Sequence, residues 1–217
     1  MSSLIKKPTW LYKPIHNVPN LDKIQKEFYR LYLAEYNDVF TDVGWAITAI
    51  DINLVKKLAP NYINFLKKLD LYNILTGTIF SGSIGVPKET CPVHVDCEDW
   101  RQLPYSLNIP IIGCEDSYTV FYEVDESTSS KNGLPSHWNN DYLTMNKIKG
   151  VIGYPEESVK EIGRQSANQT AFVNISMPHR PMTNHTGLRL AMLSRFTPDI
   201  FDYVNNDIFK TKLAELS

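Results

Sequence analysis

The stretch Pro92-Val93-His94-Val95-Asp96 opens a series of short β-type segments that decides the fold of this chain. Further segments rich in β-branched and aromatic residues lie at residues 105–112, 117–124, 141–145, 170–176 and 188–196. Several short strands at such spacing, bounded by turn residues, are typical of an antiparallel sandwich or barrel. No Gly-rich phosphate loop follows any of them. We therefore predict a mainly β fold with flanking helices rather than a parallel α/β fold.

The N-terminal part of the chain mixes extended and helical patterns. Residues 8–18 suit an edge strand or arm, and residues 44–50 and 72–80 suit strands, the last ended by the turn Ser81-Gly82-Ser83. Residues 21–36 repeat apolar side chains every three or four positions, which predicts an amphipathic helix with Asn20 as a candidate N-cap. A second helical pattern covers residues 54–69, where Pro60 allows two helices or one helix after a turn.

Two helical patterns are found in the C-terminal half. Residues 155–165 predict a short helix, with Glu156 and Glu157 in its first turn complementing the helix dipole. Residues 198–213 carry apolar side chains at helical spacing, so we expect this segment to dock on the rest of the domain as a helix.

Length and composition indicate one globular domain. The chain has 217 residues, of which 43% are hydrophobic and 21% charged. We expect an N-terminal helical part at about residues 1–70, a β core at about 72–197 and a C-terminal helix at about 198–214. The formal charge of −2 and the lack of a long basic run disfavour nucleic acid as a partner. Without a signal-like segment or an apolar run of roughly 18 residues, a cytoplasmic protein with no membrane span is expected.

The pair His94 and Asp96 is the first candidate for chemistry. Alternation along a strand places both side chains on the same face, where the imidazole and the carboxylate can bind one metal ion together. A second imidazole from another strand would complete two histidines and one carboxylate, the ligand set of non-heme Fe(II) oxygenases. His179 follows the β-type segment 170–176, and Arg189 opens the next one, so both are expected to face inward from adjacent antiparallel strands.

These motifs resemble the 2-oxoglutarate/Fe(II)-dependent oxygenases, and among them the aspartyl/asparaginyl and prolyl hydroxylases. The family pattern is His-x-Asp/Glu, a distal His many tens of residues later, and Arg or Lys about ten residues further on. Here it is matched by His94 and Asp96, then His179, then Arg189, and the resemblance covers roughly residues 75–196. Some branches of the family place a serine two residues after the arginine, and this sequence has Ala191 there.

The resemblance implies a double-stranded β-helix, the jelly-roll or cupin-like barrel, with Fe(II) held by His94, Asp96 and His179. It implies that Arg189 binds the distal carboxylate of the cosubstrate 2-oxoglutarate, and that O2 is used to hydroxylate an organic substrate with release of succinate and CO2. The substrate class stays open between an amino acid, a peptidyl residue and a small metabolite.

Several residues have weaker or competing roles. Ser106 and Asn108 share a strand face and either touch the cosubstrate or are hydrogen-bonded barrel residues. Arg101 is a candidate for a substrate carboxylate, with a plain surface arginine as the alternative. His185 is the rival distal ligand, although its sequence context reads as a turn. Arg195, of the same strand parity, is the rival to Arg189.

Three further expectations complete the sequence analysis. Cys91, Cys97 and Cys114 lack a disulfide or zinc pattern and are expected to be reduced thiols. The segment 125–149 is expected to be a lid that selects the target. The alternatives to an oxygenase are a cupin-type protein that holds a metal or small ligand without turnover, and a purely structural jelly roll.

Overall fold

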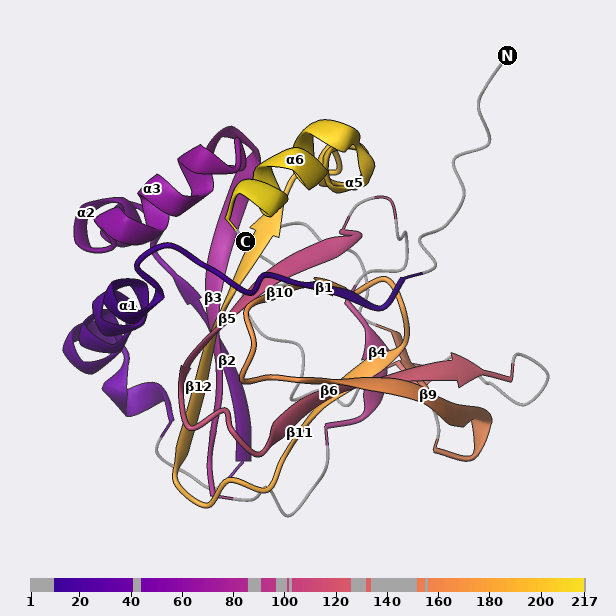
Figure 1. Cartoon of the computed structure of the whole chain (residues 1–217). Coiled ribbons are helices and arrows are strands. Elements are labelled where there is room, and N and C mark those ends of the chain that lie inside the picture. The colour runs from indigo at the N-terminus through magenta and orange to yellow at the C-terminus, as the bar shows by residue number, and fades with distance from the viewer. Residues whose placement is uncertain are drawn as a thin grey trace.

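Two antiparallel sheets of six strands each form the body of the protein (Figure 1). The computed structural model describes residues 10–40, 44–85, 91–96, 101, 103–125, 132–133, 152–154 and 156–216. Sheet A has the order β1 (Tyr12–Pro14), β10 (Ala171–Asn174), β5 (Tyr105–Ile112), β12 (Leu188–Phe196), β3 (Leu75–Ile84) and β2 (Gly44–Ile50). Sheet B has the order β7 (Asn132–Gly133), β8 (Ile152–Tyr154), β4 (Val93–Val95), β11 (His179–Thr183), β6 (Ser117–Val124) and β9 (Val159–Ser166).

The connectivity of the two sheets is that of a jelly roll. Along the chain, β3, β5, β10 and β12 belong to sheet A, whereas β4, β6, β9 and β11 belong to sheet B. The chain therefore passes back and forth between two four-stranded layers, and every pairing within them is antiparallel. This is the double-stranded β-helix that the sequence predicts, and the prediction is confirmed.

Helices cover the outer face of sheet A, as Figure 1 shows for both ends of the chain. These helices are α1 (Leu21–Glu35), α2 (Ile52–Leu58), α3 (Pro60–Lys68), α5 (Ile200–Asn205) and α6 (Asp207–Glu215). Elsewhere the chain forms 3-10 turns at η1 (Asn37–Val39), η2 (Tyr72–Ile74) and η4 (Glu156–Ser158). The largest hydrophobic cluster lies between these helices and the sheet. In it Phe28 of α1 meets Phe80 of β3 edge to face, and Phe209 of α6 meets Phe172 of β10.

The space between the two sheets is filled differently. Alternation along β3 and β12 sends Phe80, Leu190 and Met192 out towards the helices and leaves smaller or polar side chains on the inner face. Only a small hydrophobic cluster around Phe121 and Val173 bridges the described parts of the sheets. Because the main core lies outside the barrel, the inside keeps room for a cavity.

The helical predictions are confirmed at the N-terminus with one exception. Pro60 stands at the first turn of α3, so the pattern at residues 54–69 is two helices, as its fixed φ and missing N–H favour. Asn20 precedes α1 but makes no side-chain cap; its backbone is left-handed, and its carbonyl accepts hydrogen bonds from the amides of Lys23 and Ile24. The predicted cap by the Asn20 side chain is therefore wrong.

The strand predicted at residues 72–80 does not end at Ser81. Strand β3 continues to Ile84, because Ser81, Gly82 and Ser83 are paired on both sides, with β2 and with β12. Satisfied backbone groups on two neighbouring strands outweigh the turn preference of a Ser-Gly-Ser sequence.

Two further predictions are corrected in the C-terminal half. Residues 159–166 form β9 instead of a helix, because pairing with β6 overrides a weak helical pattern that contains Gly163. The C-terminal pattern is two helices instead of one, since the side chain of Asn206 accepts from the Phe209 amide and starts α6. The strand β11 was not predicted, and residues 141–145 lie outside the described residues.

Among the described residues, no helix combines the length and the apolar character that crossing a membrane requires.

Candidate metal and cosubstrate site

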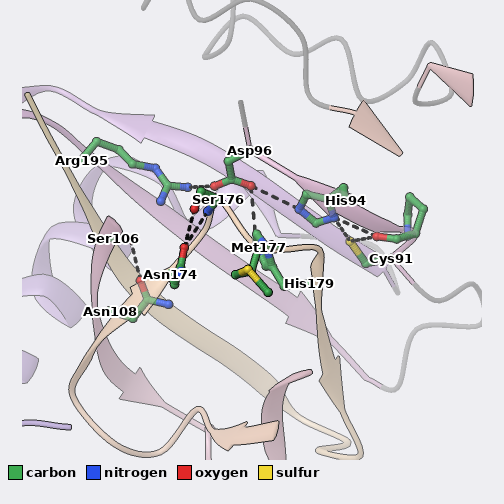
Figure 2. Close-up of polar contacts among 11 residues, drawn as sticks. Cys91, His94, Asp96, Ser106, Asn108, Asn174, Ser176, Met177, His179 and Arg195 are labelled. Atoms are coloured by element: carbon green, nitrogen blue, oxygen red, sulfur yellow. Dashed lines mark hydrogen bonds and ion pairs between the residues drawn. The ribbon is translucent and has the colours of Figure 1, made fainter. Parts of the chain in front are cut away.

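His94, Asp96 and His179 meet between the two sheets. His94 lies on β4, Asp96 follows that strand directly, and His179 is the first residue of β11. The two histidines are direct cross-strand partners, and their ring centroids are 4.7 Å apart. The Nε2 atoms of His94 and His179 lie 3.4 and 3.6 Å from Oδ1 of Asp96. One ligand atom from each residue therefore falls within 4.8 Å of the others (Figure 2).

Backbone carbonyls set the orientation of both imidazole rings. Nδ1 of His94 lies 2.8 Å from the carbonyl oxygen of Pro92, and Nδ1 of His179 lies 2.9 Å from that of Met177. A carbonyl oxygen can only accept a hydrogen bond, so each Nδ1 carries the hydrogen. The Nε2 atoms are thereby directed at Asp96, and this is how metal-binding histidines are usually held.

Arg195 holds the third member of the set. Its Nη2 donates to Oδ2 of Asp96 at 2.6 Å, so the two oxygens of that carboxylate have separate roles (Figure 2). Burial by itself raises the pKa of Asp96, but the Arg195 charge and the adjacent histidines outweigh it and hold this pKa far below its usual range. Asp96 is therefore ionised, with Oδ1 left to face the two imidazoles.

The two histidines differ in protonation. Burial, together with the positive charge of His94, lowers the pKa of His179 to about 4. Burial also opposes protonation of His94, but Cys91 and Asp96 beside it raise its pKa well above the ordinary value. A proton at His94 next to Asp96 and a divalent cation therefore compete for the same place.

The donor set fits a divalent metal. Two neutral imidazoles and one carboxylate supply three ligands on one side, and imidazole with carboxylate is a set that Fe(II) accepts. All three side chains are buried or nearly so and are supported by a second layer of hydrogen bonds. Within the described residues, this is the one group of histidine, cysteine and acidic side chains close enough to bind an ion together.

A cavity of about 290 Å³ lies next to the triad between the sheets. Sheet A contributes Trp45, Asn108, Arg189 and Arg195 to its lining, and sheet B contributes Thr119, His179 and Pro181. Val173, Ile175 and Leu193 supply apolar wall.

Arg189 is the charged residue of this cavity that has no acidic partner among the described residues. Its side chain is only 5% exposed. Nη1 donates to the carbonyl oxygen of Ser81 at 3.0 Å and approaches the Ser81 hydroxyl at 3.3 Å, whereas Nε is buried without a partner. Burial lowers the pKa of the guanidinium, and the neighbouring Cys114 acts in the opposite direction. A buried guanidinium without an acidic partner is suited to bind an anion.

The predicted placement of His179 and Arg189 on adjacent strands is wrong. Arg189 lies on β12 in sheet A, whereas His179 lies on β11 in sheet B, so the two residues face each other across the cavity. The connection between β11 and β12 crosses from one sheet to the other, as connections between consecutive strands commonly do in a jelly roll. Residues that are close in sequence therefore lie on opposite walls of the cavity.

The remaining predicted residues have different environments. Asn108 lines the cavity, and Ser106 is fully buried and donates to its Oδ1 at 2.6 Å, which leaves the Asn108 amide hydrogens to face the cavity. Arg101 lies in an exposed turn and is not among the residues that line the cavity. His185 packs against Gly113 and Gly187 at the base of the β11–β12 loop, away from the triad.

Three features of the site were missed in the sequence. Arg195 supports Asp96 directly; its shared parity with Arg189 was visible, but its partner was not. Trp45 comes from β2, far from every motif. The thiol of Cys91, three residues before His94, lies 3.7 Å from Nδ1 of that histidine. Cys91 and Cys114 are free, and Cys97 lies outside the described residues.

Comparison with known proteins gives remote structural similarity only. No protein-family model and no curated protein sequence matches the chain. Among solved structures, the chain is similar to the non-heme alpha ketoglutarate dependent carbocyclase SnoK from nogalamycin biosynthesis, with 12% identity over 86% of this chain and 79% of the other, at a TM-score of 0.48. For the alpha ketoglutarate dependent epimerase SnoN the values are 13%, 86%, 78% and 0.46.

A Pseudomonas putida prolyl-4-hydroxylase is similar at 10% identity over 87% of this chain and 93% of the other, with a TM-score of 0.45. At such values the likeness carries no information about the reaction, which has to be inferred from the residues of the site.

Proposed function

We propose that this protein is a dioxygenase that uses Fe(II), 2-oxoglutarate and O2 to hydroxylate an organic substrate, with release of succinate and CO2. The observation that carries the proposal is the shared cavity: a His-Asp-His set directed at one point, and a buried arginine with no acidic partner among the described residues. A metal site alone fits many binding proteins. The added unpaired cation fits a second, anionic ligand beside the metal.

His94, Asp96 and His179 would hold the iron, which when bound supplies activation of O2 coupled to oxidative decarboxylation of 2-oxoglutarate. Arg189 binds the distal carboxylate of the cosubstrate and so determines which way the molecule lies in the cavity. A guanidinium suits this role because its fork of donors matches a carboxylate.

Other residues of the cavity orient and protect these groups. Arg195 keeps Oδ2 of Asp96 occupied and so presents Oδ1 to the metal position. Asn108, with its carbonyl oxygen held by Ser106, offers an amide donor to an oxygen of the bound cosubstrate. Val173, Ile175 and Leu193 give the cavity an apolar wall, and a less polar surrounding strengthens ion pairs formed inside it.

The choice between the two arginines follows from their partners. Arg195 is already neutralised by Asp96, whereas Arg189 has only uncharged partners among the described residues. Arg189 is therefore assigned to the cosubstrate and Arg195 to the metal ligand.

The substrate is a small molecule or a peptidyl residue, and we keep the expectation of a cytoplasmic protein. The role of Arg101 in binding a substrate carboxylate remains a prediction. The cupin-type alternative, a binding protein without turnover, gives no reason for an uncompensated arginine beside the triad.

An anaerobic titration tests the proposal. Adding Fe(II) and then 2-oxoglutarate to the purified protein should produce the weak visible charge-transfer band of a metal–keto-acid complex, and admitting air should yield succinate. If the folded protein gives neither the band nor succinate, the assignment as an oxygenase is wrong. Stoichiometric metal binding by folded protein that gives neither the band nor succinate would favour the cupin-type alternative.

A further inference from the structure

Trp45 lines the cavity from β2, a strand that is added to the edge of the eight-stranded barrel. The centre of its ring lies 5.0 Å from Cζ of Arg189, which places the guanidinium over the ring face. Trp45 is half-buried and belongs to none of the hydrophobic clusters formed by the described residues. The contact that the structure gives for this ring is the one with Arg189.

The strand register explains how Trp45 reaches Arg189. Trp45 on β2 pairs with Ser83 on β3, and the same Ser83 pairs with Arg189 on β12. The three residues thus form one row across three strands, and the small side chain in the middle lets the outer two meet above it. Two residues further along these strands, the next row whose side chains face the cavity side consists of Ile47 on β2, Ser81 on β3 and Ala191 on β12.

These two rows shape one end of the cavity. Large side chains on the edge strand β2 form a wall, and small side chains on β3 leave the space in front of Arg189 open. Trp45 covers the guanidinium face, and Ser81 takes one of its N–H groups. Nε is buried without a hydrogen-bond partner, and the Cys114 thiol lies beside the guanidinium.

We propose that Trp45 is a positioning residue for Arg189 and forms the wall of the subsite that takes the distal carboxylate of 2-oxoglutarate. This inference rests on the proposed function and adds to it a residue from outside the barrel. The ring face attracts the cation and fixes its plane, and the indole keeps water away from the ion pair with the carboxylate. The contribution of Trp45 is therefore confined to ligands that carry that carboxylate.

The test compares two keto acids that differ in the distal carboxylate. Dissociation constants for 2-oxoglutarate and for pyruvate are measured anaerobically on the Fe(II)-loaded protein through the charge-transfer band. For Trp45→Ala we expect roughly tenfold weaker binding of 2-oxoglutarate and no change for pyruvate. Trp45→Phe, which keeps an aromatic face, should restore most of the affinity.

Fluorescence provides a second measurement that does not depend on activity. Binding of 2-oxoglutarate should change the tryptophan emission of the wild type and of Trp10→Phe, and this change should be clearly smaller in Trp45→Phe, which retains Trp100 and Trp138. Trp10 is the matched control because it stacks on Tyr105 with ring centroids 4.3 Å apart and does not line the cavity.

The outcomes separate this inference from the proposed function. If the wild type forms the band but Trp45→Ala binds 2-oxoglutarate as tightly as the wild type, or loses pyruvate equally, Trp45 is not a positioning residue and the oxygenase assignment stands. The inference is also overturned if 2-oxoglutarate changes the tryptophan emission of Trp45→Phe as much as that of the wild type. If the wild type forms no band with either keto acid, the oxygenase assignment itself fails.

Discussion

Arg195 donates from Nη2 to Oδ2 of Asp96 at 2.6 Å, across 99 residues of sequence. The pair is buried, and it joins the strand β12 of sheet A to the metal-binding end of β4 in sheet B. The charged hydrogen bond fixes the rotamer of Asp96, so this ligand is already oriented for the ion before the ion binds.

Removal of that neighbour should weaken metal binding. For Arg195→Met we expect an affinity for Co(II) about 10- to 100-fold lower, because Asp96 loses both its orientation and the charge that keeps it ionised. Isothermal titration with Co(II) measures the change. Arg189→Met is the matched control in the same cavity and should bind Co(II) as the wild type does; equal losses in both variants would contradict the separate roles.

His179 and His185 distinguish the two candidate distal ligands. We expect His179→Ala to abolish stoichiometric metal binding, because two of the three ligands cannot hold the ion against water. His185→Ala should keep it, since His185 packs on Gly113 and Gly187 instead of facing the triad. The reverse pattern in a metal titration would show that the distal ligand is His185.

Metal affinity should depend on pH through His94. Cys91 and Asp96 raise the pKa of His94 against the effect of burial, so a cation has to displace a proton from this ring below that pKa. The affinity for Co(II) should therefore rise about tenfold per pH unit and level off above the His94 pKa. His179, with a pKa lowered to about 4, adds no such dependence near neutrality. An affinity that stays flat from about pH 6 to about pH 8 would contradict this proton count.

Arg189 should carry a cost in stability that reflects its function. Arg189→Met removes a buried cation that has no acidic partner among the described residues, so we expect the free energy of unfolding without ligands to rise by about 1 kcal/mol. Fe(II) should still stabilise the variant, but the further stabilisation that 2-oxoglutarate gives to the Fe(II)-loaded wild type should be absent. Chemical denaturation with and without both ligands measures the two effects; a loss of several kcal/mol without ligands would mean that Arg189 is structural.

The hydroxyl of Tyr62 joins α3 to the barrel through Ser194, at 2.5 Å between the oxygens. Tyr62→Phe should lower the free energy of unfolding by about 1–2 kcal/mol, because it leaves the buried Ser194 hydroxyl with only the sulfur of Met192. Ser194→Ala is the reciprocal variant. The double variant should cost less than the two single changes together, and strict additivity would show that the bond contributes little.

Local pattern determined much of this protein. The periodicity around Phe28 predicts α1, Pro60 marks the start of α3, and the β-type segments predict four barrel strands with nearly correct ends. The His94-x-Asp96 alternation and the spacing to His179 and Arg189 pick out the residues that line one cavity. The helix and the strands are readable because they depend on the chain's own repeat, of two residues in a strand and 3.6 in a helix, whereas the spacing to His179 and Arg189 was recognised through the family resemblance.

Other features were decided only by partners distant in sequence. Ser81 to Ser83 and residues 159–166 became strands because neighbouring strands satisfied their backbone groups. The crossing from β11 to β12 places His179 and Arg189 on opposite walls of the cavity. As a result Arg195 hydrogen-bonds to Asp96, and Arg189 contacts the ring of Trp45. The sequence by itself therefore determined which side chains could take part in a metal site, whereas only the packing of two sheets decided which arginine pairs with Asp96 and which has no acidic partner among the described residues.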